Sequence, residues 1–223
     1  MKILLVGLLL FVTACGQQEE KGSEVKYQQV NWTYNSNFTS SEQSKIQSAM
    51  NVLASRIDQG KIWDCAYNNY KKWYTWGVPG MNNTTDFENF IYRTERAFSN
   101  GVPRIYLSSY YENSSSFGRA SVDNYVEPKF VNTTSLVAIY RMQGTFNISL
   151  NRYNLSNADW ATADTWAGVI FHELLHQMGH SHPNGYKDGN YITVAGDCLQ
   201  ENGSFSSRSS LTLAGGRRWA IPD

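Results

Sequence analysis

The sequence predicts a single α+β domain. Two long helices are expected, one after Thr39 and one that ends near Met178, and the segments between them alternate apolar and polar residues as strands do. The second helix carries part of a run, residues 172–182, that holds all four histidines of the chain. Residues 25–223, which follow a predicted targeting segment and tether, are long enough for one domain with a hydrophobic core.

The N-terminus has the pattern of an export signal. Lys2 gives a positive start, residues 3–12 are apolar but too few to span a bilayer, and small residues precede Cys15. Residues 12–15 resemble a bacterial lipobox. This resemblance implies that residues 1–14 are a lipoprotein signal peptide and that Cys15 becomes the lipidated N-terminus. A plain secretory signal, cleaved nearby, is the alternative.

Residues 15–24 are polar and show no apolar periodicity, so a flexible tether between lipid and domain is expected. The lipoprotein resemblance implies a location in a bacterial cell envelope, with the lipid bilayer as a partner through the acyl anchor. Gly16 is not the aspartate that retains a lipoprotein in the inner membrane. We therefore expect the outer membrane, with surface exposure as one option.

Composition gives no sign of nucleic-acid binding. The chain has 19 Lys and Arg against 19 Asp and Glu, and neither sign clusters. Neither an internal repeat nor a second domain is indicated, and we expect a monomer.

Aromatic residues make up 14% of the chain. They could stack on sugars, but packing in the core is the favoured explanation.

The N-terminal part of the domain is expected to form a strand and a helix. Apolar and aromatic residues alternate within residues 25–35, as in a strand. Thr39 and Glu42 have the spacing of a capping box, and apolar residues then follow at helical spacing until Gly60 stops the run.

The middle of the chain alternates helix and strand signals. A helix is expected over residues 87–98, and strands over residues 103–111, 136–142 and 145–150. A Gln-Gly pair separates the last two strands and predicts a hairpin turn between them. Residues 113–129 are expected to be a connection.

The helix with the histidines is expected to begin near Asn157 or Thr162 and to run to Met178. His172 and His176 are four residues apart, so they share a helix face and can both point at one metal ion.

The residues around this pair complete a candidate metal site. Glu173 follows the first ligand, where its carboxylate can hold and deprotonate a metal-bound water. Gly179 can take the positive φ that ends a helix, and the reversal brings His182 back as a third ligand. Three nitrogens leave one open position, as in a catalytic zinc site. His180 could compete as third ligand, but we expect it behind the ligands or at the surface.

The string from His172 to His182 satisfies H-E-x-x-H-x-x-G-x-x-H and so resembles the metzincin clan of zinc metalloproteases. The resemblance implies a zincin/metzincin-like α+β fold, in which a twisted mixed β-sheet backs two long helices and a small C-terminal subdomain follows. It also implies one catalytic Zn²⁺ and an edge strand that binds the substrate in extended form. Residues 145–151 and 106–111 are the two candidates for that strand.

One feature of the clan is missing. Metzincins carry a methionine in a tight turn beneath the zinc, but no methionine occurs after Met178. Residues 194–199 are the best candidate for that turn, with Cys198 or Leu199 in place of methionine. Tyr186 and Tyr191 are two open candidates for stabilising the developing oxyanion.

Two cysteines remain after lipidation, Cys65 and Cys198. An oxidising envelope favours a disulfide between them, which would join an early helix to the segment after the histidines. If they were reduced, a thiolate of Cys198 could ligate the zinc. Calcium near Asp188 and Asp197 is an option that no ligand pattern supports.

We therefore expect a zinc metallopeptidase: an endopeptidase of the bacterial cell envelope that acts on peptide or protein substrates through a zinc-bound water activated by Glu173. One alternative is a zinc hydrolase acting on a non-protein amide such as peptidoglycan. The other is a non-catalytic zinc-binding lipoprotein, or a His-rich helix end that takes up metal incidentally. The presence of Glu173 counts against the non-catalytic alternative, which has no need of a carboxylate there.

Overall fold

The computed structural model describes residues 30–73, 83–101, 104–120, 126–134, 137–182 and 190–204. The predicted signal peptide, the tether and Cys15 lie outside these residues, as do Tyr186 and Asp188. Within the described residues, no helix is both long and apolar enough to cross a membrane. The division of the chain into signal, tether and domain therefore stays a prediction.

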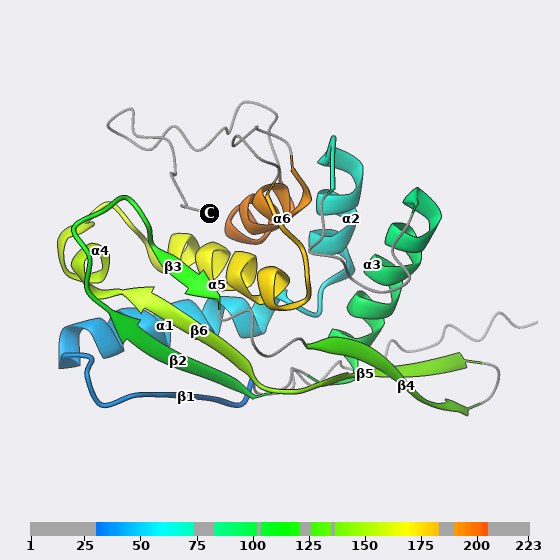
Figure 1. Cartoon of the computed structure of the whole chain (residues 1–223), viewed down its shortest axis with the longest axis horizontal. Helices are drawn as coiled ribbons and strands as arrows, with labels where there is room; N and C mark the ends of the chain where they lie inside the picture. Colours follow the sequence, from blue (N-terminus) through cyan, green and yellow to red (C-terminus); the bar gives the residue numbers. More distant parts are fainter. Residues whose placement is uncertain are drawn as a thin grey trace, which may run out of the picture.

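Four strands form a twisted, mixed sheet in the order β1-β2-β6-β3 (Figure 1). They are β1 (Trp32–Tyr34), β2 (Ile105–Tyr110), β6 (Phe146–Asn151) and β3 (Gly118–Ala120). β1, β2 and β6 run parallel, and β3 pairs antiparallel with β6. Apolar side chains alternate along the two central strands, and one face is buried, with Ile105, Leu107, Phe146, Ile148 and Leu150. The sheet therefore offers one apolar face to the helices, and the α+β prediction is confirmed.

The predicted hairpin between residues 136–142 and 145–150 is wrong. Both strands form, but β5 (Val137–Gln143) pairs with β4 (Glu127–Thr134), whereas β6 joins the larger sheet. Gly144 has a φ of 119°, which glycine adopts without steric cost, and here the chain passes from one sheet to the other. The connection predicted at residues 113–129 in fact contains β3 and the start of β4.

The predicted capping box is confirmed and starts α1 (Ser40–Arg56). The Thr39 hydroxyl accepts a hydrogen bond from the Glu42 N–H (3.3 Å), and the Glu42 carboxylate accepts one from the Thr39 N–H (2.7 Å). Gly60 does not simply stop this helix, because it is the first residue of α2 (Gly60–Asn69). α3 (Thr84–Ser99) confirms the helix predicted at residues 87–98.

Three helices follow the sheet: α4 (Arg152–Asn157), α5 (Ala163–Gln177) and α6 (Tyr191–Gln200). Of the two predicted starts of the histidine helix, Thr162 is the correct one, because its side chain accepts from the N–H of Thr165 and caps α5. The turn predicted at residues 194–199 is wrong. Those residues belong to α6, which the Asn190 side chain caps by accepting from the Thr193 N–H (3.1 Å).

α5 is the centre of the core. It lies between the sheet and α6, and it also packs against α1, β3 and β6 (Figure 1). Its residues from Thr165 to Gln177 are all buried. α6 packs against α2 as well as α5, so the described chain after His182 joins the main core and forms no separate subdomain.

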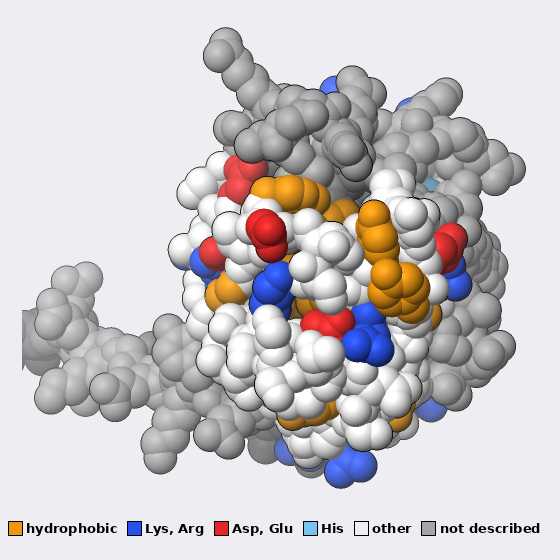
Figure 2. Space-filling view, turned by 90° about the vertical axis from the view of Figure 1, so that its left-hand side faces the viewer, with side chains coloured by type: hydrophobic (Ala, Val, Ile, Leu, Met, Phe, Trp, Pro, Cys, Tyr) orange, Lys and Arg blue, Asp and Glu red, His pale blue; other side chains and the backbone are white. Residues whose placement is uncertain are grey.

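Three of the helices are long. α1, α3 and α5 have 17, 16 and 15 residues, so the helix predicted at residues 87–98 is as long as the two that were expected to be long. α3 packs against the β4–β5 hairpin. Among the described residues on the face shown in Figure 2, acidic and basic side chains are interspersed, in line with the balanced composition.

Candidate metal centre

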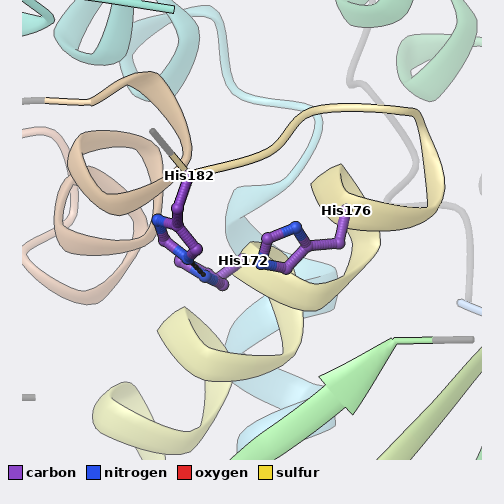
Figure 3. Close-up of side chains that lie close together, drawn as sticks. All are labelled: His172, His176 and His182. Carbon is purple, nitrogen blue, oxygen red and sulfur yellow. Dashed lines mark hydrogen bonds between the residues drawn. The ribbon is translucent and has the colours of Figure 1, made fainter. Parts of the chain in front are cut away.

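Three of the four histidines come together. One ring nitrogen from each of His172, His176 and His182 can be chosen so that all lie within 4.8 Å of one another. His172 and His176 project from successive turns of α5, and His182 reaches back from the segment after that helix (Figure 3). Nε2 of His172 lies 3.1 Å from Nε2 of His182. Two nitrogens that bind one tetrahedral zinc ion are about 3.3 Å apart, so this donor set fits a metal ion.

The end of α5 explains how His182 returns to the site. Gly179 has a φ of 88°, as predicted from the sequence. Its N–H donates to the carbonyl of His176 (2.9 Å), and the N–H of His180 donates to the carbonyl of Leu175 (3.1 Å). This pair of bonds is the Schellman motif, which reverses the chain at a helix C-terminus.

Backbone carbonyls orient two of the three rings. Nδ1 of His176 donates to the carbonyl of His180 (2.9 Å), and a neutral imidazole that donates from Nδ1 carries its lone pair on Nε2. The His172 ring hydrogen-bonds to the backbone of Ile192 in α6. Because Nε2 of His172 faces His182, Nδ1 is the nitrogen left for this bond. Such carbonyl acceptors are the usual supports of metal-binding histidines.

His180 lies outside the cluster of three histidines, and it is buried. Its carbonyl supports His176, while its ring packs edge-on against Phe87 and Phe90 and lies 5.2 Å from the Tyr191 ring. Of the two places expected for His180, behind the other histidines or at the surface, the structure shows the first. Tyr191 is buried in the same aromatic cluster, and its hydroxyl has no hydrogen-bond partner among the described residues, so its role at an oxyanion stays a prediction.

Burial sets the protonation of the histidines. It lowers the pKa of His172 well below the ordinary value of 6.5, and the neighbouring charges of His176 and His182 lower it further. Burial alone lowers the pKa of His182 to about 4. Both rings are therefore neutral at physiological pH, as a metal ligand must be.

Glu173 lies buried next to the first ligand. Its Oε1 is fully enclosed and has no hydrogen-bond partner among the described residues, and its carboxylate accepts a bond from the backbone of Ala120 in β3. Burial raises the pKa of this carboxyl to about 8, and the bond from Ala120 offsets part of that rise. A buried carboxyl with an unused oxygen is a candidate for proton transfer.

The edge strand beside this carboxyl is β3. Among the described residues β3 has β6 as its one neighbour, whereas residues 106–111 and 145–151 lie largely in β2 and β6, inside the sheet. Both strand candidates from the sequence are therefore wrong. Sequence analysis also missed Gly118 of β3 and Ile192 of α6, because a three-residue strand and a backbone acceptor leave no periodic or chemical signal.

The predicted disulfide is confirmed. Cys65 of α2 and Cys198 of α6 are bridged, with their Cα atoms 5.9 Å apart. The bridge removes Cys198 as a candidate metal ligand. Asp197, which was considered for a calcium site, is buried within α6. Among the described residues, the three histidines are the one cluster of metal-binding side chains.

Comparisons with protein-family models, with curated proteins and with solved structures found no match for this chain.

Proposed function

We propose that this chain is a zinc-dependent endopeptidase of a bacterial cell envelope. The observation that carries the proposal is the combination of three converging histidines with a buried carboxyl, Glu173, that adjoins the first of them and keeps one oxygen unpaired. A site that served only to hold metal would gain nothing from a buried carboxyl whose pKa is raised to about 8. The resemblance of the histidine run to metzincins supports the same activity.

The three histidines would hold the metal through neutral nitrogens. A bound zinc ion would act as a Lewis acid and bring the pKa of a coordinated water toward neutrality. Glu173 would accept the proton of the attacking water and then donate it to the leaving amine of the cleaved peptide bond. Burial raises the pKa of this carboxyl to about 8 without metal, and a bound zinc ion would lower it, since a nearby cation favours the carboxylate that accepts the proton.

The position of β3 at the edge of the sheet favours a peptide as the substrate over a smaller amide. A strand at the edge of a sheet can pair with an extended peptide through its outward-facing backbone groups. β3 contacts Glu173 through both Gly118 and Ala120. A peptide added to this edge would therefore run past the carboxyl that transfers the proton.

The envelope location rests on the N-terminal sequence. A lipid on Cys15, followed by the polar tether of residues 16–24, would hold the domain close to a bilayer. The disulfide between Cys65 and Cys198 suits an oxidising compartment outside the cytoplasm.

The test is cleavage of a mixed peptide library by the chain from residue 15 onward, with Cys15→Ser to prevent lipidation and with zinc supplied. Glu173→Ala is the matched control. Cleavage that a chelator abolishes, and that Glu173→Ala lacks while it still binds zinc, is the expected result. A folded, zinc-loaded wild type that cleaves no peptide would overturn the endopeptidase and favour the peptidoglycan amide or a binding role.

A further inference from the structure

α5 and α6 approach each other backbone to backbone beside the metal centre. A Cβ on Gly168 would lie 2.8 Å from the carbonyl oxygen of Gly196. A Cβ on Gly196 would lie 3.2 Å from the carbonyl oxygen of Gly168 and 3.5 Å from Cβ of His172. The helices can come this close because both residues at the crossing lack a side chain.

The hydrogen bond to the first metal ligand lies one turn away from this crossing. His172 is four residues after Gly168 in α5, and Ile192 is four residues before Gly196 in α6. Along this contact the residue numbers rise in α5 and fall in α6, so the two helices run antiparallel. The His172 ring bonds to the backbone of Ile192 at this next turn. The approach of the two glycines therefore sets the distance between the His172 ring and its acceptor.

A disulfide holds α6 in this position. Cys198 lies two residues after Gly196 and is bridged to Cys65, which places the bond between α6 and α2. Cys198 is fully buried, and Cys65 is 7% exposed. The bridge is thus part of the packed core that lies behind the contact with His172.

α1 holds the C-terminal end of the same helix. The guanidinium of Arg56 donates to the carbonyls of Leu199 (2.9 Å) and Gln200 (2.8 Å), and it also forms an ion pair with Asp164 in the first turn of α5. One side chain therefore joins the end of α6 to the start of α5, as the antiparallel crossing requires.

We propose that α6 is the positioning element of the metal centre, and that closing the Cys65–Cys198 disulfide gives the centre its full metal affinity. Closure oxidises the two thiols, and an external disulfide such as oxidised glutathione is reduced to two thiols in the exchange. α6 thereby supports the ligands from a helix that contains residues 194–199, the segment that was expected to form a turn beneath the zinc. This inference rests on the metal centre of the proposed function and adds a regulation to it, because tight metal loading follows oxidation.

The sharpest test leaves all ligands and the disulfide in place. Gly196→Ala in the full chain pushes α6 away from α5 by a few tenths of an ångström, because its new Cβ meets backbone. We expect zinc affinity to fall about tenfold, which is typical when a partner that orients a ligand is disturbed. Alanine is a better helix former than glycine, so reduced helix propensity would not explain the loss.

Gly60→Ala is the matched control, because its Cβ would make only an ordinary contact, 3.4 Å from Oε1 of Glu95. Zinc affinity is measured by competition with a chromogenic chelator. In ¹⁵N-histidine-labelled protein, the ring N–H of His172 should exchange with solvent faster in Gly196→Ala than in the control. A purely structural substitution would leave that proton protected.

Cys65→Ala/Cys198→Ala is the second variant, checked for folding by circular dichroism, and it should weaken zinc binding at least as much as Gly196→Ala. Wild-type affinity in Gly196→Ala would overturn the inference, whether or not the cysteine variant folds. Zinc affinity is measured without substrate. A wild type that binds zinc but cleaves no peptide would therefore overturn the endopeptidase alone and leave this inference standing.

Discussion

The carboxyl group of Glu173 lies directly against the backbone of Gly118, although one belongs to the central helix α5 and the other to the edge strand β3. A Cβ at position 118 would lie 3.0 Å from Cγ of Glu173 and 3.1 Å from its Oε1. The strand thus leaves just enough room for this carboxyl, and its position depends on the residue opposite. A substitution at Gly118 therefore tests the proposed proton transfer by Glu173, because in the described contacts Gly118 touches none of the three histidines.

Gly118→Ala should lower kcat by between about 10- and 100-fold, because a displacement of the reacting group by less than 1 Å can have an effect of that size. Zinc affinity should stay at the wild-type value, since no ligand moves. Steady-state kinetics on a cleaved peptide, together with chelator competition, measure the two effects. An unchanged kcat would show that Glu173 is not the group that transfers the proton.

Glu173→Gln should stabilise the metal-free protein while it abolishes cleavage. Burial raises the pKa of Glu173 from 4.5 to about 8. The stability that this group contributes is therefore fully present below pH 4.5 and is lost as the pH rises toward 8. The neutral amide avoids that loss.

Thermal unfolding in chelator therefore separates the two proteins by pH. The Tm of Glu173→Gln should exceed that of the wild type by a margin that grows from pH 5 to pH 8. Equal margins at both pH values would contradict the burial of an ionisable group at this position.

Two substitutions by phenylalanine, one at His182 and one at His180, distinguish the proposed third metal ligand from its alternative. His182→Phe removes a metal-binding nitrogen and should weaken zinc binding by more than about 100-fold. Loss of a residue that merely orients a ligand already costs up to about 100-fold, and loss of the ligand itself should cost more. His180→Phe should bind zinc like the wild type, because His176 bonds to the carbonyl of residue 180 and not to its ring. The reverse pattern in chelator competition would make His180 the ligand.

His180→Phe should also reduce acid sensitivity. Burial lowers the pKa of His180 from 6.5 to about 3, and its Nδ1 has no hydrogen-bond partner among the described residues. Between pH 6.5 and about pH 3, His180 is protonated in the unfolded chain and neutral in the folded protein. The free energy of unfolding therefore falls as the pH drops below 6.5. Urea midpoints of metal-free wild type and variant should diverge between pH 7 and pH 5, in favour of the variant. Parallel midpoints would contradict this.

Cys15→Ser should move the protein from the membrane fraction to the soluble fraction of an expressing bacterium, because one acylated N-terminus supplies the predicted anchor. Fractionation with immunodetection measures the change. A wild type that is already soluble would favour the plain secretory signal.

Local chemistry made part of this structure predictable. The capping box of Thr39 and Glu42, the positive φ of Gly179 and the spacing of the three histidines each depend on residues close together in the chain. The disulfide was predictable because, of the three cysteines, Cys15 is predicted to carry the lipid and one pair remains. In each case a short motif determined the geometry.

The failures have a different cause. Strand pairing depends on contacts between distant segments, so the Gln-Gly turn at Gly144 gave no hint that β5 and β6 belong to different sheets. The metzincin resemblance favoured a turn at residues 194–199, whereas Asn190 caps a helix in which Tyr191, Val194 and Cys198 follow at helical spacing. A family pattern thus outweighed a local signal that was correct.

The three metal-binding rings differ in how far they are from solvent. His172 and His176 are 2% and 7% exposed, whereas His182 is only partly buried and stands beyond the end of α5. Of the three rings, His182 is therefore the most accessible to an ion that comes from solvent. If an ion exchanges at His182, its rate of exchange depends on the chain reversal at Gly179, whereas under our proposal its affinity depends on the contact between α5 and α6.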